Sequence, residues 1–434
     1  MQDIEALYDR FRACTAVSTD SRQPQNGTLF FALNGPSFRG AGFAPGAIAQ
    51  GARHAVTDDA TLAEQDPEHY TYAPDPLLAL QALARHHRRQ LIIPVLAITG
   101  SNGKTTTKEL VHAVLSTRYS VQYTRGNLNN HIGVPLTLLS IRSGEHELAI
   151  VEMGANHQGE IELLCQLAEP THGLITNIGK AHLEGFGGQD GILKGKTELF
   201  RFLASVGGTA FINTLDHRLA GLTDLVPQHV TYPGPADTYP ATMLSAAPQV
   251  VLRLADGTVA EAHITGDYNF PNLAAAAAVG AYFEVSTQEV ATALAAYAPA
   301  NNRSQMVQTG RNEVVLDAYN ANPSSMAAAL RSFATRPGVS NAAKVAILGD
   351  MFELGDESPG EHQVLGHLLA ELPLGTVVLI GPDMARAAAV DPSFRYFASK
   401  PEAAAWLQQQ SLQGRQILIK GSRGMGLESL LNLV

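Results

Sequence analysis

Residues 97–109, AITGSNGKTTTKE, combine glycine, lysine and threonine at a spacing suited to binding a polyphosphate. An apolar segment ends at Thr99, and a short glycine loop leads into the polar start of a predicted helix. Gly100 and Gly103 allow main-chain N–H groups to turn toward phosphate oxygens. Lys104 offers a cation for the β- and γ-phosphates, and the Thr105 hydroxyl offers a ligand for Mg²⁺. We therefore expect a nucleotide to contact Gly100, Ser101, Asn102, Gly103, Lys104, Thr105 and Thr106.

This phosphate-loop motif is incomplete, because Ile98 stands where the usual pattern has a glycine. A glycine turn that merely joins a strand to a helix therefore remains an alternative. The residues that follow along the chain bear on that choice.

Two further side chains are suited to hold a metal ion beside such a loop. Glu152 follows four apolar residues, so we expect it at the C-terminal edge of a sheet, where α/β folds bind their ligands. His182 lies in the glycine-rich loop after the next strand. Because imidazole is an unusual Mg²⁺ ligand, His182 would have to act with carboxylate oxygens and water. A capping acid at a strand end and a structural, hydrogen-bonded histidine are the alternative interpretations.

The segment LDAYNANPSSM (316–326) has a high density of polar residues after a predicted strand. Such a loop after a strand is typical of a ligand site. Its candidate residues are Asp317, Tyr319, Asn320 and Asn322. The loops at 348–363, which is strongly acidic, and at 418–428 follow later strands in the same way.

Four other candidates have less distinctive surroundings. Asn269 and Asn272 stand at the start of a predicted helix, where one would cap the helix and the other would be free for a base edge. Lys196 lies close to Lys194 on a helix where exposed lysines are the simpler interpretation. Arg303, between two predicted domains, is either a linker charge or a phosphate contact.

Size and composition restrict the class of protein. A chain of 434 residues with 45% hydrophobic residues predicts about three globular domains. The net charge of −10 provides no general basic field, so we expect no nucleic acid partner. The longest apolar runs, such as 91–98, are far short of a membrane span, so we expect no membrane insertion. Two cysteines, Cys14 and Cys165, suit a reducing compartment, and the charged N-terminus is no secretion signal. These features predict a cytoplasmic protein.

The order of apolar segments predicts an α/β fold with three domains: 1–88, 89–303 and 304–434. The first is a small α/β unit with strands in 27–33 and 52–59 and a helix at 77–90. We interpret the basic end of that helix, from His86 to Arg89, as a solvated C-terminus that complements the helix dipole.

The second predicted domain is a mainly parallel sheet around the phosphate loop, with strands near 95–99, 148–154, 173–179 and 209–213. An Asp256-Gly257 turn predicts a β-hairpin, and residues 272–283 predict a helix. The third is a Rossmann-like, doubly wound domain with strands near 313–319, 344–350, 376–381 and 416–422.

Taken together, the motifs resemble the Mur ligases, ATP-dependent amide-forming enzymes of peptidoglycan synthesis, and among them the F type. The resemblance covers nearly the whole chain, and its joint pattern is highly specific. Its motifs are TDSR (19–22), GSNGKTTTKE (100–109), GNLNNHIGVPLTLL (126–139), EMGANHQGEI (152–161), TNIGKAHLEGFG (176–187), KGKTELF (194–200), GDYNFPNLAAA (266–276), DAYNANPSSM (317–326), LGDMFELG (348–355) and KGSRGMGLE (420–428).

This resemblance implies a reaction, its cofactors and its partners. The enzyme would join D-alanyl-D-alanine to UDP-N-acetylmuramoyl-tripeptide through an acyl phosphate, using ATP and Mg²⁺. We expect residues 1–88 to bind the UDP-sugar nucleotide, 89–303 to bind ATP, and 304–434 to bind ATP and the incoming dipeptide. We expect a cytoplasmic monomer that binds these small molecules.

The resemblance also implies residue roles. Lys104, Lys196 and His182 would be catalytic, and Lys196 would carry a carbamate. The metal would be held by Thr105, Glu152, His182 and Lys196. Beyond the phosphate loop, Asn269, Asn272, Arg303 and Asp317 would contact ATP. The substrates would be bound by Thr19, Asp20, Ser21, Arg22, Asn129, Asn130, Tyr319, Asn320 and Asn322.

The chain departs from the F-type pattern at SFRGAGF (37–43), where a D-G-x-x-F sequence is common. This difference bears on the contacts to the sugar nucleotide. Two alternatives remain open. A folylpolyglutamate synthase-like ligase would lack the TDSR-type N-terminal domain, and a catalytically silent nucleotide-binding scaffold would not need Lys104, Glu152 and His182.

Overall fold

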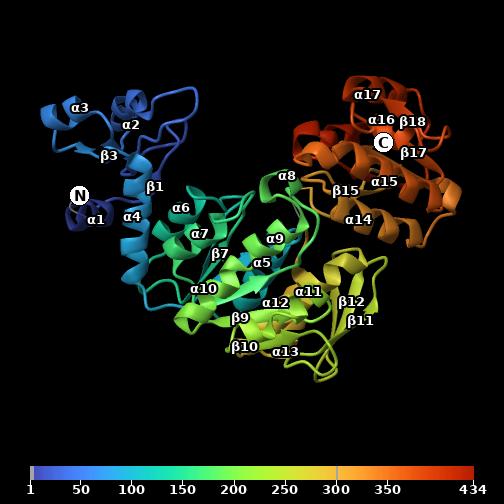
Figure 1. Cartoon of the computed structure of the whole chain (residues 1–434), viewed down its shortest axis with the longest axis horizontal. Helices are drawn as coiled ribbons and strands as arrows, with labels where there is room; N and C mark the ends of the chain where they lie inside the picture. Colours follow the sequence, from blue (N-terminus) through green and yellow to red (C-terminus); the bar gives the residue numbers. More distant parts are fainter. Residues whose placement is uncertain (1–3, 300–301) are drawn as a thin grey trace.

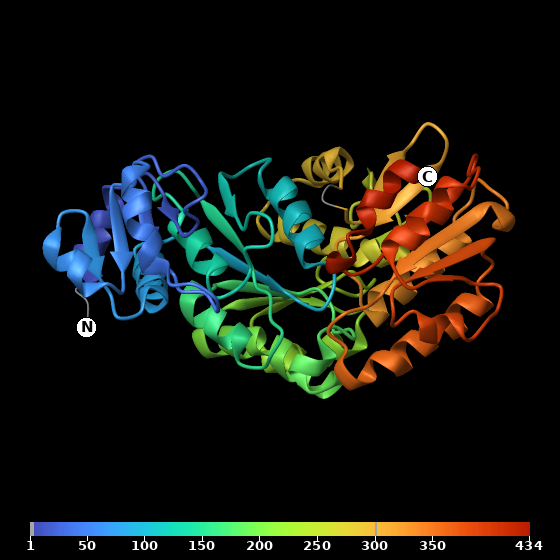
Figure 2. The same ribbon diagram turned by 90° about the horizontal axis from the view of Figure 1, so that it is seen from above.

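Short apolar strands, each followed by turn residues, form four β-sheets in the computed structural model, which describes residues 4–299 and 302–434. Figures 1 and 2 show an N-terminal lobe (4–89) and a C-terminal lobe (305–434) at opposite ends of a central lobe (95–296). No helix in the described ranges is long and apolar enough to cross a lipid bilayer.

The N-terminal lobe contains a parallel sheet in the order β1-β2-β3-β4. Its strands β2 and β3 confirm the strands predicted within 27–33 and 52–59, and α4 confirms the predicted helix. The elements are α1 Ile4–Arg12, β1 Val17–Ser18, β2 Leu29–Phe31, α2 Ala44–Ala49, β3 His54–Thr57, α3 Ala60–Gln65, β4 Tyr70–Tyr72 and α4 Pro76–Arg89.

The central lobe is built on a six-stranded sheet in the order β10-β9-β8-β5-β7-β6, parallel throughout. The prediction of a parallel sheet is therefore confirmed. Its elements up to the end of the sheet are β5 Val95–Thr99, α5 Lys104–Leu115, β6 Val121–Tyr123, α6 Gly133–Leu139, β7 Leu148–Glu152, α7 Glu160–Ala168, β8 His172–Ile175, α8 Leu183–Phe186, α9 Gln189–Lys196, α10 Glu198–Val206, β9 Thr209–Asn213, α11 His217–Ala220 and β10 His229–Tyr232.

An antiparallel sheet, β11-β12-β13, follows in the central lobe. The hairpin predicted at Asp256-Gly257 joins β12 to β13, and Gly257 has the positive φ of 93° that this turn requires. The elements are β11 Ala241–Ser245, β12 Val250–Leu254, β13 Val259–Ala262, α12 Phe270–Tyr282 and α13 Thr287–Ala296. The helix α12 confirms the helix predicted at 272–283.

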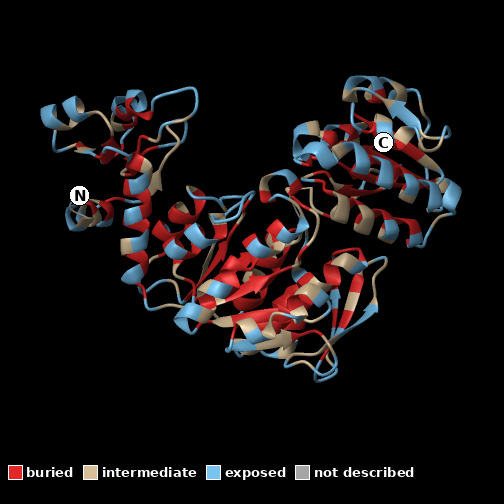
Figure 3. Ribbon diagram, in the orientation of Figure 1, coloured by how far each residue is buried: buried red, intermediate tan, exposed pale blue. Residues whose placement is uncertain are grey.

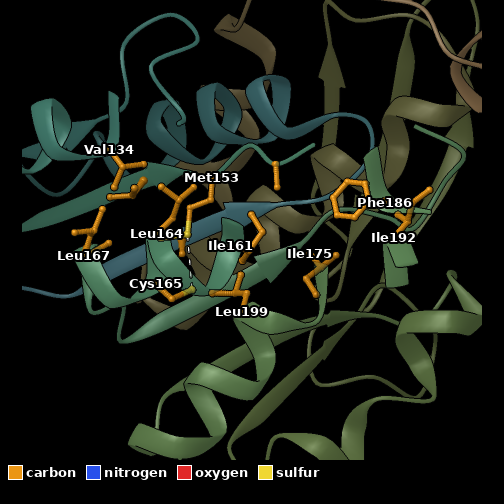
Figure 4. Close-up of a cluster of buried hydrophobic side chains, with 14 of the residues drawn as sticks. Val134, Met153, Ile161, Leu164, Cys165, Leu167, Ile175, Phe186, Ile192 and Leu199 are labelled. Carbon is orange, nitrogen blue, oxygen red and sulfur yellow. Dashed lines mark hydrogen bonds between the residues drawn. The ribbon is translucent and has the colours of Figure 1, made fainter. Parts of the chain in front are cut away.

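Both faces of the central sheet are covered, as the long apolar runs of its strands require. Side chains of α5, α12 and α13 form one apolar cluster with the sheet, and those of α6, α7 and α10 form another. Buried residues follow the sheet strands in Figure 3. Figure 4 shows part of the second cluster, from Val134 and Leu167 through Met153 and Cys165 to Phe186 and Ile192. This cluster therefore supports the loop that carries His182 and the helix α9 that ends at Lys196.

The C-terminal lobe has a six-stranded sheet in the order β14-β15-β19-β16-β17-β18, in which β14 alone is antiparallel. Helices α14 to α16 pack on one face and α17 on the other, so the doubly wound prediction is confirmed. The elements are β14 Gln305–Gln308, β15 Glu313–Asp317, α14 Pro323–Thr335, β16 Lys344–Gly349, α15 Ser358–Glu371, β17 Thr376–Ile380, α16 Ala385–Ala388, β18 Arg395–Phe397, α17 Lys400–Gln408 and β19 Gln416–Lys420.

The prediction of a solvated basic end for α4 is wrong for two of its four residues. His87 and Arg88 are buried. The Arg88 guanidinium donates to the carbonyls of Ala168 and Glu169, and His87 Nε2 lies 2.9 Å from the Ile141 carbonyl. The reason is that α4 packs against α6 and α7, so its last turn lies at the interface between the lobes. These side chains attach the N-terminal lobe to the central one.

Candidate functional site

A cavity of about 840 Å³ lies where the carboxyl ends of the central strands face the C-terminal lobe. Most of the predicted site residues line it, although they are far apart in the sequence. Its wall includes Ser101, Asn102, Gly103, Lys104, Thr105, Thr106, Asn129, Asn130, Glu152, His182, Asn269, Asn272, Arg303, Asp317, Tyr319, Asn320 and Asn322.

The phosphate loop joins β5 to α5 at the floor of this cavity. Gly103 has a φ of 78°, and a Cβ there would lie 2.6 Å from the Asn272 Oδ1, so a larger residue would collide. The Asn102 N–H donates to the Asn177 Oδ1 at 3.1 Å, which anchors the loop to the strand end of β8. The loop is thus held by its own lobe.

Lys104 lies over this loop. Its Nζ donates to the carbonyls of Gly100 at 2.8 Å and Ser101 at 3.2 Å. Burial, with a smaller contribution from the nearby Arg303, lowers the pKa of Lys104 to about 8, although Glu152 opposes the shift. A bound polyanion would favour the charged amine and reverse this effect.

Glu152 is fully buried at the end of β7, as its position after a strand predicted. Its Oε1 accepts from the Thr105 hydroxyl at 3.1 Å and from the Asn129 amide at 2.8 Å. Hydroxyl and carboxylate oxygens are the donors that Mg²⁺ prefers, so this pair fits such an ion. In residues 4–299 and 302–434, no three His, Cys, Asp or Glu side chains gather as an alternative metal-binding group.

His182 and Lys196 are not directed toward that pair of oxygens. His182 has a left-handed backbone (φ 54°), and its Nδ1 lies 2.5 Å from the Glu353 Oε2 of the C-terminal lobe. Lys196 is buried behind the cavity wall, where its Nζ donates to the Ala155 carbonyl at 3.2 Å and lies 4.9 Å from the centre of the Phe186 ring. Burial, with Lys104 nearby, holds the Lys196 pKa well below its usual range.

Asn269 occupies the N-cap position of α12, but neither it nor Asn272 caps the helix through its side chain, so that expectation is wrong. Instead the Asn272 amide donates to Asn269 Oδ1 at 3.0 Å, and Asn272 Oδ1 accepts from the Thr107 hydroxyl at 3.1 Å. The two residues link α12 to the phosphate-loop helix. They line the cavity as a connected pair.

Two asparagines predicted to bind substrate are also used within the protein. Asn129 bonds Glu152 as described above, and its carbonyl accepts from the Gly154 N–H. Asn130 Oδ1 accepts from the main-chain N–H groups of Ile132 and Gly133 at the start of α6. Their side chains shape the wall of the cavity.

The opposite wall belongs to the C-terminal lobe. Asp317, at the end of β15, accepts from the buried Lys420 Nζ at 2.6 Å and from the Ser304 N–H at 3.2 Å. The Arg303 guanidinium stacks 3.6 Å from the centre of the Tyr319 ring. Lys420 also donates to the Asn320 carbonyl at 3.1 Å. A carboxylate and a cation thus face the phosphate loop across the cavity.

Polar contacts join the two walls directly. The Asn322 amide donates to Asn102 Oδ1 at 2.7 Å, while Asn322 also caps α14 through the Ser325 N–H. The Ser324 hydroxyl accepts from the Lys180 N–H at 2.8 Å, and the Lys180 side chain pairs with Glu361. The two walls of the cavity are therefore joined by contacts between residues that are far apart in the chain.

The predicted TDSR segment lies elsewhere, in the N-terminal lobe and outside this cavity. Arg22 donates to both carboxylate oxygens of Asp20 at 2.8 Å, and this contact lowers the Asp20 pKa to about 2. The atypical 37–43 segment presents two exposed rings, Phe38 and Phe43, with centres 5.7 Å apart.

Sequence reasoning missed several residues of the site. Lys108 and Glu353 contact the predicted residues Glu152 and His182, but they were not singled out. Lys180 and Ser324, which contact each other between the lobes, were not singled out either. Lys108 stands one helical turn after Lys104, which is a detectable signal. Glu353 belongs to the acidic 348–363 loop that the sequence did single out. The partners of these residues come from distant segments.

Comparison with protein families gives matches along most of the chain. The description "Mur ligase family, catalytic domain" matches residues 14–90, "Mur ligase middle domain" matches 98–280, and "Mur ligase, glutamate ligase domain" matches 302–423. These three ranges correspond broadly to the three lobes.

Curated relatives match over nearly their full length. The UDP-N-acetylmuramoyl-tripeptide–D-alanyl-D-alanine ligase of Bacillus subtilis is 32% identical over 425 residues, with 96% of this chain and 92% of the relative covered. The protein of that name from Escherichia coli is 34% identical over 430 residues, with the same coverage.

Solved structures agree with the sequence matches. A crystal structure of MurF from Acinetobacter baumannii has a TM-score of 0.88 and 33% identity, and covers 99% of this chain and 98% of that one. MurF ligase from Thermotoga maritima in complex with ADP has a TM-score of 0.84 at 24% identity, and covers 100% and 98%. The latter likeness supports the fold.

Proposed function

The chain belongs to the Mur ligase family, and we propose that it uses ATP to join D-alanyl-D-alanine to UDP-N-acetylmuramoyl-tripeptide. The products are the UDP-linked pentapeptide, ADP and phosphate. The observation that carries this proposal is the cavity that brings Lys104 and Glu152 of the central lobe together with Asp317 of the C-terminal lobe and with Arg303, which lies between the two lobes. The names of relatives at 32–34% identity supply the substrates.

The chemistry needs phosphate stabilisation rather than a nucleophilic side chain. A carboxylate is a poor acyl donor, so the γ-phosphoryl group is first transferred to the terminal carboxylate of the tripeptide. Lys104 and the N–H groups of the phosphate loop offset the repulsion between the two anions. The neutral amine of the dipeptide then attacks the acyl phosphate, and phosphate leaves.

Mg²⁺ is part of this proposal, with Thr105 and Glu152 as its protein ligands. When bound, it would neutralise charge on the phosphate oxygens. We also propose that His182 joins these ligands after leaving Glu353. In addition, the buried Lys196 would carry a carbamate, because its lowered pKa leaves the amine neutral and able to add carbon dioxide.

The lobes take separate parts in the proposal. Residues 1–88 bind the UDP-sugar nucleotide, with Thr19, Asp20, Ser21 and Arg22 as contacts. Residues 89–303 and 304–434 hold ATP between them, and the latter receive the dipeptide beside Tyr319, Asn320 and Asn322. We propose that the enzyme acts as a monomer in the cytoplasm, where ATP is present.

The test is phosphate release from Mg·ATP, measured with the UDP-tripeptide, with D-alanyl-D-alanine, and with both. We expect release to require both substrates and to yield a pentapeptide product of the corresponding mass. Release with a folate and glutamate instead would assign the folylpolyglutamate synthase-like alternative. No release with any substrate pair, while ATP still binds, would assign the scaffold.

A further inference from the structure

A second lysine lies on the phosphate-loop helix one turn beyond Lys104. Lys108 is fully buried, with 0% of its surface exposed. Its Nζ donates to the Gly126 carbonyl at 3.1 Å and lies 3.5 Å from Glu152 Oε2. That oxygen has no hydrogen-bond partner among the described residues, so the Lys108 ammonium is the group that balances it.

A buried ammonium is costly unless it is paired and hydrogen-bonded. A methionine would fill a similar volume without that cost, and apolar replacements of buried ion pairs are often neutral or stabilising. Packing alone therefore gives no reason for a charge at position 108. The groups that Lys108 joins suggest another reason.

Lys108 lies between two parts of the cavity wall and contacts both of them. One is the Glu152 carboxylate, whose other oxygen faces Thr105 and Asn129. The other is the loop at 125–131, reached through the Gly126 carbonyl, which carries the cavity residues Asn129 and Asn130. The Asn129 carbonyl also accepts from the N–H of Gly154, just after β7, at 2.7 Å. This bond joins the 125–131 loop to the end of the strand that carries Glu152.

We propose that Lys108 is a positioning residue that fixes both the Glu152 carboxylate and the 125–131 loop. By holding Oε2, it keeps Oε1 directed at Thr105 in the geometry suited to a divalent cation. By holding Gly126, it keeps Asn129 on the same carboxylate. The mechanistic part of this inference rests on the proposed function.

The experiment compares Lys108→Met with Lys344→Met. Lys344 is a matched control because it is also buried, and its Nζ donates to the Ala334 carbonyl in the C-terminal lobe, away from the cavity. The first readout is amide hydrogen exchange at 125–131 and Gly154 in the protein without ligands. The second is the Mg²⁺ concentration that gives half-maximal phosphate release.

We expect Lys108→Met to accelerate exchange in 125–131 and at Gly154 at least about tenfold, and to raise the half-maximal Mg²⁺ concentration about 10- to 100-fold. Lys344→Met should leave the exchange rates and the half-maximal Mg²⁺ concentration within about twofold of the parent. The reason is that Lys344 does not contact a metal ligand, whereas loss of a partner of a metal ligand weakens metal binding. Equal behaviour of the two variants would overturn the inference.

A double variant covers the case in which Lys108→Met does not fold. Lys108→Met with Glu152→Gln leaves no unbalanced charge, and Glu152→Gln alone is its reference. Faster exchange at 125–131 in the double variant supports the inference, and identical exchange rejects it. Because exchange is measured without substrates, this result is independent of phosphate release. Failure of the parent to release phosphate would instead reject the proposed function.

Discussion

The two walls of the cavity are fixed in different ways. On the central wall, Glu152 and the phosphate loop are held by partners within the central lobe, including Thr105 on α5 and Asn177 after β8. The C-terminal wall has its own buried pair, Asp317 with Lys420, and meets the central wall through contacts between the lobes, such as Asn322 with Asn102 and Lys180 with Glu361. One wall is therefore prearranged within its lobe, whereas the position of the other depends on contacts between lobes.

This difference assigns separate tasks to the walls. The prearranged wall suits groups that must stabilise charge as it develops, because they need no rearrangement during the reaction. A wall that is placed by contacts between lobes suits a lobe that closes after ligands enter. The comparison predicts large effects on the rate from changes to the central wall and small effects on binding from changes where the walls meet.

Replacing Lys104 should have the largest effect. Lys104→Met removes the cation that faces the transferred phosphate, and we expect phosphate release to fall roughly 10²- to 10³-fold. Lys194→Met, an exposed lysine on α9, is the control and should retain parental rates. The measurement is steady-state phosphate release at saturating substrates. A loss of less than about threefold would mean that the central wall does not supply this charge.

The protonation of Lys104 gives a second, smaller effect. Its pKa of about 8 in the free protein must rise when a polyanion binds, so the charged amine is the form that favours ATP. The affinity for ATP is therefore highest well below pH 8, where Lys104 is charged, and it declines as the pH increases through 8. We expect the dissociation constant of ATP to increase about tenfold between pH 7 and 9.

Calorimetry in buffers of different ionisation enthalpy measures the same linkage directly. At pH 8, ATP binding to the parent should take up close to half a proton, because the free amine is about half protonated at its pKa. Lys104→Met should abolish the uptake. If uptake persists in that variant, another group on the cavity wall is responsible.

The fold was predictable where burial leaves a strong pattern. The interior strands β5, β7 and β16 are buried along their whole length and mostly apolar, and the sequence predicted all three. The strands it did not predict lie at sheet edges, such as β6 (VQY) and β18 (RYF), whose residues are partly or fully exposed. Edge strands owe their conformation to a neighbour, so their own residues carry little signal.

The site was predictable in composition but not in its pairings. Glycine, lysine and a carboxylate at strand ends indicate a phosphate and metal site whatever their partners are. The partner of Lys108 could not be inferred, because Gly126 and Glu152 come from other segments of the fold. The prediction of a solvated end for α4 was wrong for the same reason. Arg88 donates to the carbonyls of Ala168, at the end of α7, and of Glu169, the next residue. Local preference does not reveal distant partners.

The smallest predicted effect concerns the contact between the walls. Asn322→Ser removes the amide that pairs with Asn102, while serine still caps α14, so helix stability is retained. A neutral hydrogen bond contributes about 1 kcal/mol, which corresponds to an increase of about fivefold in the KM for ATP. We expect an unchanged kcat, because the prearranged wall is untouched.

Small-angle scattering separates this effect from damage to the site. The two lobes should be further apart on average in ligand-free Asn322→Ser than in the parent, because a contact between them is lost. With ATP and both substrates bound, the two proteins should give the same compact profile, since ligand contacts then hold the walls together. A reduced kcat with unchanged scattering would contradict this comparison. It would mean that Asn322 takes part in the reaction instead of holding the two walls together.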